Sequence, residues 1–132
     1  MTLNDLYSIA DTNDIPVYHF PLSPLKSMAV PNVIAIDVTA IDTAREEKEH
    51  LAHELGHCMK YAFYTGTSPH ELKSQKEYRA TKWAIKTLIP LVALNKAIKD
   101  GIATKWELAE YFDVSEELVE SALQLYEEKM RM

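Results

Sequence analysis

The segment His53-Glu54-Leu55-Gly56-His57 limits the possible folds of this chain more than any other feature of its sequence. In a helix, two histidines four residues apart lie on one face, one turn above each other. Apolar residues surround the segment on several sides, so we expect the helix to be buried. Buried polar groups without partners cost several kcal/mol. The fold must therefore supply a partner at this helix face, and a metal ion is one.

The spacing predicts a zinc site. Two imidazoles on successive turns can bind one Zn²⁺ at about 2.0–2.1 Å each. Glu54 lies about 100° round the helix from His53, so its carboxylate can reach a metal-bound water without ligating the metal. Zinc lowers the pKa of such a water to about 7, and a carboxylate can take its proton. We predict His53 and His57 as zinc ligands and Glu54 as the catalytic base; the alternative is a structural histidine pair.

A catalytic zinc usually has three protein ligands and one open position, whereas a structural zinc has four ligands. Glu77 is our candidate for the third ligand. It shares a helix face with Ala80, Ala84 and Leu88, and a carboxylate on such an apolar stripe is unusual unless it is paired or binds metal. The small alanines would let two helices approach closely. Glu71 remains an alternative ligand, and Glu77 could instead be a rim residue paired with a basic neighbour.

Other polar residues near these segments are weaker candidates. His70 could donate a hydrogen bond to a tetrahedral intermediate, although a histidine in a surface loop is more common. A phenol near the oxyanion could come from Tyr78, Tyr61 or Tyr64, and the sequence does not choose among them. For His50 we favour a position in solvent or a supporting contact behind the metal ligands.

Between residues 15 and 39 the apolar residues change to the two-residue period of strands. A weak strand begins near Ile15. Ser27–Val30 and Val33–Thr39 are β-branched runs separated by Pro31-Asn32, a plausible turn between antiparallel strands. Four prolines lie in this region, so the sheet is expected to be small.

The remainder of the chain is expected to be helical. Thr43 and Thr104 each stand three residues before a glutamate, which is the pattern of a capping box. Pro90 and Gly101 mark helix ends. The expected helices are 2–11, 43 to about 63, about 69–89, 91–98, 104–112 and 115 to about 130. We therefore predict an α+β fold: a small N-terminal antiparallel sheet of about three strands packed on a mainly helical domain.

Composition narrows the function. The 132 residues suit one domain, with parts 1–42, 43–100 and 101–132. The formal net charge is −6, which argues against a nucleic-acid partner, because phosphate binding needs clustered Lys and Arg. The single cysteine, Cys58, is expected to pack in the core. Neither a signal-peptide pattern nor a run of roughly 18 apolar residues is present, so we expect a cytoplasmic protein without a membrane partner.

Two motifs resemble the ImmA/IrrE family of metallopeptidases. The first is Glu49–His57, which contains the family pattern H-E-[LI]-G-H. The second is Glu77-Tyr78-Arg79-Ala80, followed by Trp83-Ala84 and an apolar run closed by Pro90. The similarity extends from about residue 2 to about residue 126. It implies a zincin-like helical domain with zinc ligands at His53, His57 and Glu77 and the base at Glu54.

Family members look like site-specific peptidases that cleave helix-turn-helix repressors and so relieve repression of phage, mobile-element or stress genes. The resemblance implies the same kind of protein substrate here. Residues 108–119 also look like the family's helix-turn-helix-like tail. Because the helix expected from residue 115 carries five glutamates and two basic residues, we do not expect it to bind DNA. The alternative function is a non-catalytic metal-binding regulatory or protein-interaction module.

Overall fold

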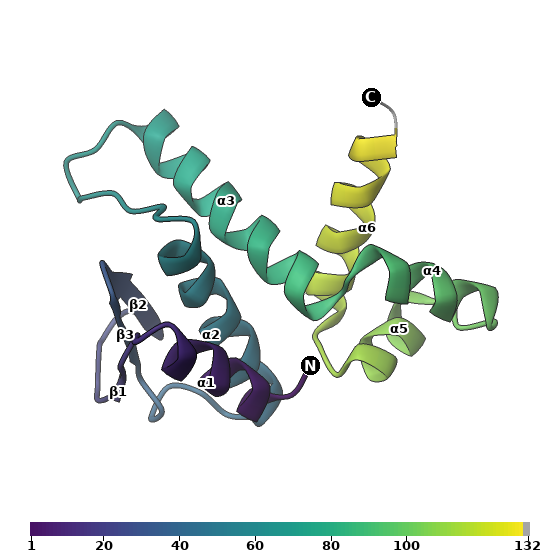
Figure 1. Ribbon diagram of the computed structural model, residues 1–132, viewed down its shortest axis with the longest axis horizontal. Helices are drawn as coiled ribbons and strands as arrows, with labels where there is room; N and C mark the ends of the chain where they lie inside the picture. Colours follow the sequence, from purple (N-terminus) through teal and green to yellow (C-terminus); the bar gives the residue numbers. More distant parts are fainter. Residues whose placement is uncertain (131–132) are drawn as a thin grey trace. The chain divides into compact units, whose positions relative to one another are not determined.

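The computed structural model describes residues 1–130 and confirms the α+β fold: a three-stranded sheet near the N-terminus, then a succession of helices (Figure 1). The elements are α1 (Leu3–Thr12), β1 (Val17–His19), β2 (Ser27–Val30), β3 (Val33–Ile36), α2 (Ala44–Met59), α3 (His70–Leu88), α4 (Leu91–Lys99), α5 (Lys105–Phe112) and α6 (Glu116–Met130). The backbone forms two compact units, which divide after Ala84 within α3. No described helix is long and apolar enough to cross a membrane.

The sheet has the strand order β1-β3-β2. As predicted, β2 and β3 are antiparallel, with Val30 opposite Val33 at their turn. The prediction of an antiparallel sheet is wrong for β1, which pairs parallel with β3. The physical reason is the apolar character of β3, whose Ile34 and Ile36 are fully buried. This strand takes the centre, and the chain leaving β1 crosses to the far edge before β2 begins.

β3 ends three residues earlier than expected, and Asp37 explains this end. Its carboxylate accepts hydrogen bonds from the backbone N–H of Leu22 at 3.0 Å and of Thr39 at 3.0 Å. The Thr39 hydroxyl donates to the same carboxylate. These bonds turn the chain away from the sheet and lead it toward α2. They also hold the pKa of Asp37 below its usual value, with the hydrogen bond from Thr39 as the largest cause.

α2 lies against α1 and against one face of the sheet (Figure 1). Its apolar face contributes Leu51, Ala52 and Leu55, all fully buried, to the core of the first unit. Thr43 caps the helix, accepting a hydrogen bond from the Glu46 N–H at 3.0 Å. The Glu46 carboxylate accepts from the N–H of Asp42, at 3.2 Å, and not from that of Thr43, so the predicted Thr43 cap forms but its reciprocal bond is shifted by one residue.

α2 ends at Met59 and not near residue 63, because the chain forms a Schellman motif there. The Ala62 N–H donates to the His57 carbonyl at 2.8 Å and the Tyr61 N–H to the Cys58 carbonyl at 3.2 Å. Tyr61 takes the left-handed conformation, with φ of 46°. A glycine is usual at that position, and its absence here removes the usual sequence signal for the end of a helix. The turn sends residues 62–65 back across the end of the helix.

α2 and α3 approach each other closely at Gly56. A Cβ atom on this residue would lie 2.4 Å from the Ala80 carbonyl oxygen. Gly56 and the buried Ala80 therefore allow the near contact of two backbones, which the alanines of α3 led us to expect. The contact places Glu77, one turn before Ala80, opposite the histidines of α2.

The second unit contains α4, α5 and α6. Thr104 caps α5 and Ser115 caps α6, each accepting a hydrogen bond from the N–H three residues on. α5 and α6 pack on each other as the expected helix-turn-helix-like pair. Asp113 makes the turn between them in the left-handed conformation. The Tyr126 hydroxyl donates to the Ile89 carbonyl at 2.8 Å.

Candidate metal centre

α2 presents His53 and His57 on one face, as the helical period requires. Their ring centroids are 4.8 Å apart and the ring planes are nearly perpendicular. The side chain of His57 is 7% exposed and that of His53 is 30% exposed. The pair thus lies at the border of the core, with one ring inside and one at the edge of the solvent.

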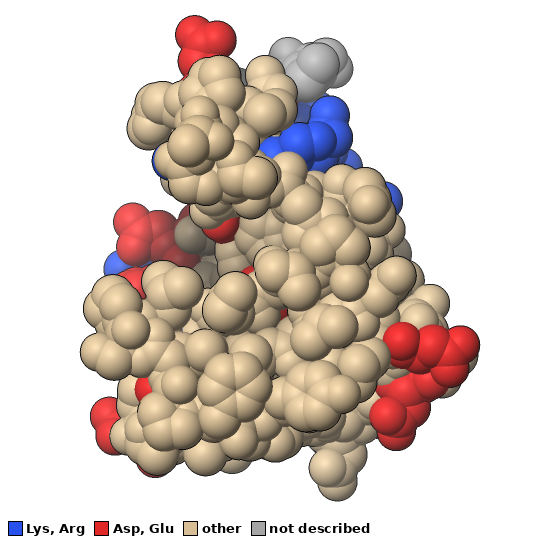
Figure 2. All heavy atoms as spheres, turned by 90° about the vertical axis from the view of Figure 1, so that its left-hand side faces the viewer, with Lys and Arg blue, Asp and Glu red and all other residues tan. Residues whose placement is uncertain are grey.

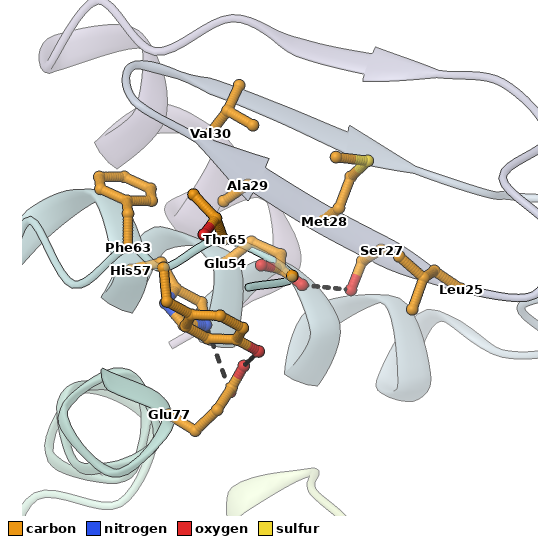
Figure 3. A pocket seen from close by; sticks show the side chains of 12 residues that line it. Leu25, Ser27, Met28, Ala29, Val30, Glu54, His57, Phe63, Thr65 and Glu77 are labelled. Atoms are coloured by element: carbon orange, nitrogen blue, oxygen red, sulfur yellow. Dashed lines mark hydrogen bonds and ion pairs between the residues drawn. The ribbon is translucent and has the colours of Figure 1, made fainter. Parts of the chain in front are cut away.

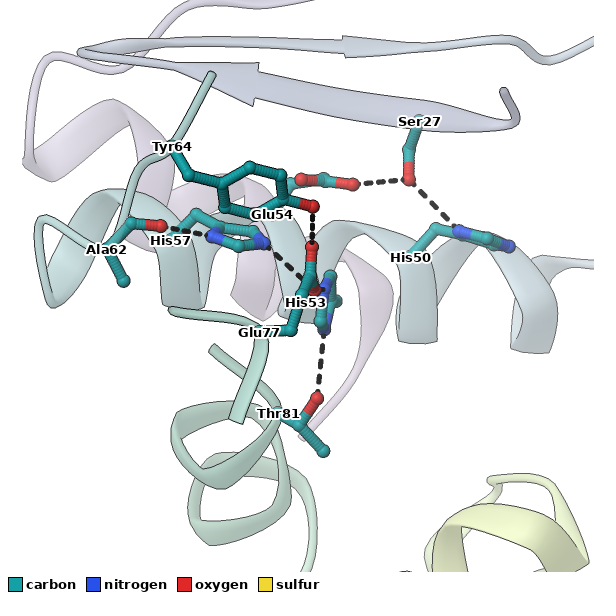
Figure 4. A network of polar contacts seen from close by, with 9 residues as sticks. All are labelled: Ser27, His50, His53, Glu54, His57, Ala62, Tyr64, Glu77 and Thr81. Atoms are coloured by element: carbon teal, nitrogen blue, oxygen red, sulfur yellow. Dashed lines mark hydrogen bonds and ion pairs between the residues drawn. The ribbon is translucent and has the colours of Figure 1, made fainter. Parts of the chain in front are cut away.

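α3 brings the Glu77 carboxylate to the same point (Figure 4). Its Oε2 lies 2.6 Å from His53 Nε2 and 3.3 Å from His57 Nε2. One potential ligand atom from each of the three residues falls within 4.8 Å of the others. The sequence predicted this group from the motif and from the apolar face of α3, and the close approach at Gly56 creates it.

The three residues fit a metal ion. In a tetrahedral site with bonds of about 2.0–2.1 Å, neighbouring ligand atoms are about 3.3 Å apart. The His57–Glu77 distance of 3.3 Å agrees with this spacing, whereas the His53–Glu77 distance of 2.6 Å is that of a direct hydrogen bond. A metal ion would take the place of this hydrogen bond after a small outward movement of one side chain.

Neighbouring groups orient the three candidate ligands. The Ala62 carbonyl can only accept, so His57 Nδ1 donates to it, and Nε2, which faces Glu77, is the nitrogen that would bind a metal. The Thr81 hydroxyl lies 3.4 Å from His53 Nδ1. The Tyr64 hydroxyl donates to Glu77 Oε1 at 2.6 Å. Such partners fix the direction and the tautomer of metal ligands.

The charges of these groups are coupled. Hydrogen bonds from His53, the larger cause, and from His57 hold the pKa of Glu77 well below its usual range. Burial lowers the pKa of His57, but its hydrogen bonds to Glu77 and to the Ala62 carbonyl outweigh burial, and the pKa is raised overall. The hydrogen bond to Glu77 raises the pKa of Tyr64 to about 12. The site therefore holds an ionised carboxylate and a neutral phenol.

Glu54 lies beside the group and not in it. It is 6% exposed and its Oε2 accepts a hydrogen bond from the Ser27 hydroxyl at 2.6 Å. Glu54, His57 and Glu77 all line a cavity of about 380 Å³ (Figure 3). Leu25, β2 and the segment 63–66 form the remainder of its wall. A carboxylate, candidate metal ligands and an open space thus meet at one place.

A family model, that of the IrrE N-terminal-like domain of the Peptidase M78 family, matches residues 8–124. The chain belongs to this family. The expected resemblance to ImmA/IrrE proteins is confirmed, and the match includes both the His53–His57 segment and Glu77. No curated protein matches the chain.

Some predicted residues of this M78 family member do not line the cavity. His70 and Glu71 are exposed on the first turn of α3, and Tyr78 is exposed two turns further along. The phenol at the site is that of Tyr64, because the Schellman turn carries residues 62–65 over the end of α2. The roles of His70 and Tyr78 remain predictions that this geometry does not favour.

Two other contacts were not predicted. Ser27 and Thr81 have no motif of their own, and only the packing of β2 and α3 against α2 places their hydroxyls at the centre. His50, for which we expected solvent or a supporting contact behind the metal ligands, lies next to Ser27: its Nδ1 is 3.0 Å from the Ser27 oxygen.

Proposed function

We propose that this protein is a zinc-dependent endopeptidase. The observation that carries the proposal is the convergence of His53, His57 and Glu77 on one point at the wall of a cavity that also contains Glu54. Two imidazoles and one carboxylate form a ligand set common in catalytic zinc sites, and three protein ligands leave a fourth position open. The M78 family match supports the same conclusion.

The protein's own residues would divide the work of hydrolysis. Zinc bound at this centre supplies Lewis-acid activation of the attacking water and of the scissile carbonyl. Glu54 takes a proton from the water on its Oε1 oxygen, since Oε2 is held by Ser27, and then passes the proton to the leaving amine. Tyr64 holds Glu77 in place through its hydroxyl.

The substrate we propose is an extended polypeptide segment. β2 is an edge strand, paired with β3 on one side, and its residues 27–30 line the cavity. An edge strand presents backbone groups with which another chain can pair. Figure 2 shows a face largely free of charged side chains, with acidic atoms visible inside its hollow. Leu25, Met28 and Val30 line the cavity and are exposed apolar side chains, so a segment with apolar side chains suits this surface.

We further propose that this segment belongs to a helix-turn-helix repressor, whose cleavage relieves repression of phage, mobile-element or stress genes. The support is the family resemblance. A repressor encoded beside this protein's gene is the first substrate to test. The helices α5 and α6 resemble a helix-turn-helix, but the first turn of α6 carries two acidic residues, Glu116 and Glu117. We propose that they do not bind DNA, and a gel shift at low salt is expected to show no complex.

The central experiment compares wild type with Glu54→Gln. Both proteins are purified with zinc, and zinc content and repressor cleavage are measured. We expect the variant to keep its zinc and to cleave about 10²–10⁴-fold more slowly, because only the proton acceptor is removed. Cleavage at the wild-type rate would refute the mechanism. A wild-type protein whose metal has four protein ligands and which cleaves nothing would instead support the non-catalytic module.

A further inference from the structure

A chain of hydrogen bonds leads from the proposed base to a histidine outside the metal centre. Ser27, the first residue of β2, donates its hydroxyl to Glu54 Oε2 at 2.6 Å. The same hydroxyl oxygen lies 3.0 Å from Nδ1 of His50, one turn before His53 on α2. Figure 4 shows the three side chains in sequence, with Ser27 above the helix and between the other two.

The number of available protons fixes the direction of these bonds. A carboxylate only accepts hydrogen bonds, and a serine hydroxyl has one proton to donate. Since Ser27 gives its proton to Glu54, its oxygen can only accept from His50. Burial lowers the pKa of His50, so the ring is neutral at pH 7 and carries one N–H. That hydrogen must then be on Nδ1.

We propose that Ser27 and His50 are positioning residues for Glu54, acting through a directed chain from His50 Nδ1–H to the Ser27 hydroxyl and from that hydroxyl to Glu54 Oε2. The effect on catalysis rests on the proposed function, whereas the hydrogen-bond direction does not. Neither residue belongs to the metal-binding group of His53, His57 and Glu77.

These two hydrogen bonds fix one oxygen of the Glu54 carboxylate, a buried group whose side chain has several rotatable bonds. With Oε2 held toward β2, Oε1 is left for the substrate water. A base held in one orientation populates the reactive rotamer and not unproductive ones, and this fixed geometry raises the rate of proton transfer. The bond also ties the base to β2, the strand that lines the cavity. The strand proposed to bind the substrate thus also orients the catalytic carboxylate.

The first test is spectroscopic and needs no activity. Long-range ¹H–¹⁵N correlation spectra of labelled protein at neutral pH identify which ring nitrogen of each histidine carries hydrogen. We expect His50 in the Nδ1–H tautomer in wild type, and a shift toward the Nε2–H tautomer in Ser27→Ala. A bare Nδ1 on His50 in wild type, or a His50 signal unaffected by Ser27→Ala, would overturn the proposed direction.

The second test is kinetic and uses zinc-loaded protein with the repressor substrate. We expect Ser27→Ala to lower kcat about tenfold or more, as is usual for a hydrogen bond to a charged group, with little change in KM or zinc content. Ser27→Thr keeps the hydroxyl and should restore most of kcat. His50→Asn keeps an N–H near the Nδ1 position and should be less impaired than His50→Ala. Ser121→Ala, an exposed serine in the second unit, is the control.

The outcomes separate the two proposals. A Ser27→Ala protein with wild-type kcat, or a loss of kcat that Thr does not restore, would refute the positioning role. A wild-type protein without any Glu54-dependent cleavage would refute the proposed function, and the tautomer of His50 would still decide whether the hydrogen-bond chain exists. Thermal unfolding of each variant identifies a protein that has failed to fold.

Discussion

Gly56 offers the strictest test of how the metal centre is built. It lies inside α2, where alanine normally stabilises a helix by about 1 kcal/mol relative to glycine. A simple propensity argument therefore predicts that Gly56→Ala stabilises the protein. The packing of α2 on α3 predicts the opposite sign.

The size of the effect follows from the contact distances. The new Cβ would lie 2.4 Å from the Ala80 carbonyl oxygen and 2.9 Å from Ala80 Cα, whereas ordinary contacts begin at 3.4 Å. Backbone atoms cannot rotate away, so α3 must move by about 1.0 Å at this point. Overpacking of this kind costs about 1–3 kcal/mol, and the middle of this range exceeds the gain of about 1 kcal/mol in helix propensity. We expect a net loss of about 1 kcal/mol.

The same movement displaces Glu77, which lies one turn before Ala80. Metal–ligand distances tolerate changes of only about 0.2 Å, so a shift of about 1.0 Å separates the carboxylate from the two imidazoles. Zinc affinity should fall about tenfold or more. Chelator competition measures the affinity, and urea unfolding of the metal-free protein measures stability separately.

Gly66→Ala is the matched control. A Cβ on Gly66 would meet no atom within 4 Å, so this substitution should leave zinc affinity unchanged. If Gly56→Ala is more stable than wild type and binds zinc equally well, the close contact between α2 and α3 does not exist, and the explanation of how Glu77 reaches the histidines fails.

Two further predictions concern residues around the centre. Tyr64→Phe removes the hydroxyl that holds Glu77 Oε1. Zinc affinity, measured by chelator competition, should therefore fall about tenfold. An unchanged zinc affinity would show that Tyr64 does not orient Glu77. The folded-state pKa of Asp37 is lowered, and the hydrogen bond from Thr39 is the main cause. The Asp37 carboxylate therefore stabilises the folded protein above about pH 4, and this stabilisation is lost as the pH falls through the lowered pKa. Urea unfolding at pH 7 should show Asp37→Asn to be less stable than wild type, and this difference should shrink below pH 4; a difference that is independent of pH would contradict the role of the carboxylate.

Features that depend on neighbouring residues could be predicted from the sequence. The four-residue spacing alone puts His53 and His57 on one face of a helix, because the helical period is fixed by the backbone. Thr43 and Thr104 set helix starts for the same local reason. The turn at Pro31-Asn32 likewise determines the pairing of β2 with β3.

Other features arise only when distant segments meet. The apolar face of α3 made Glu77 a candidate, but the backbone contact of Gly56 with Ala80 brings its carboxylate to the imidazoles. The choice of Tyr64 among three tyrosines depends on a left-handed turn at Tyr61, a residue that rarely makes one. Local patterns predict which side chains share an element, since they follow from the geometry of one backbone segment. Which hydroxyl faces Glu54, and which phenol faces Glu77, depends on packing between elements, and no period in the sequence encodes it.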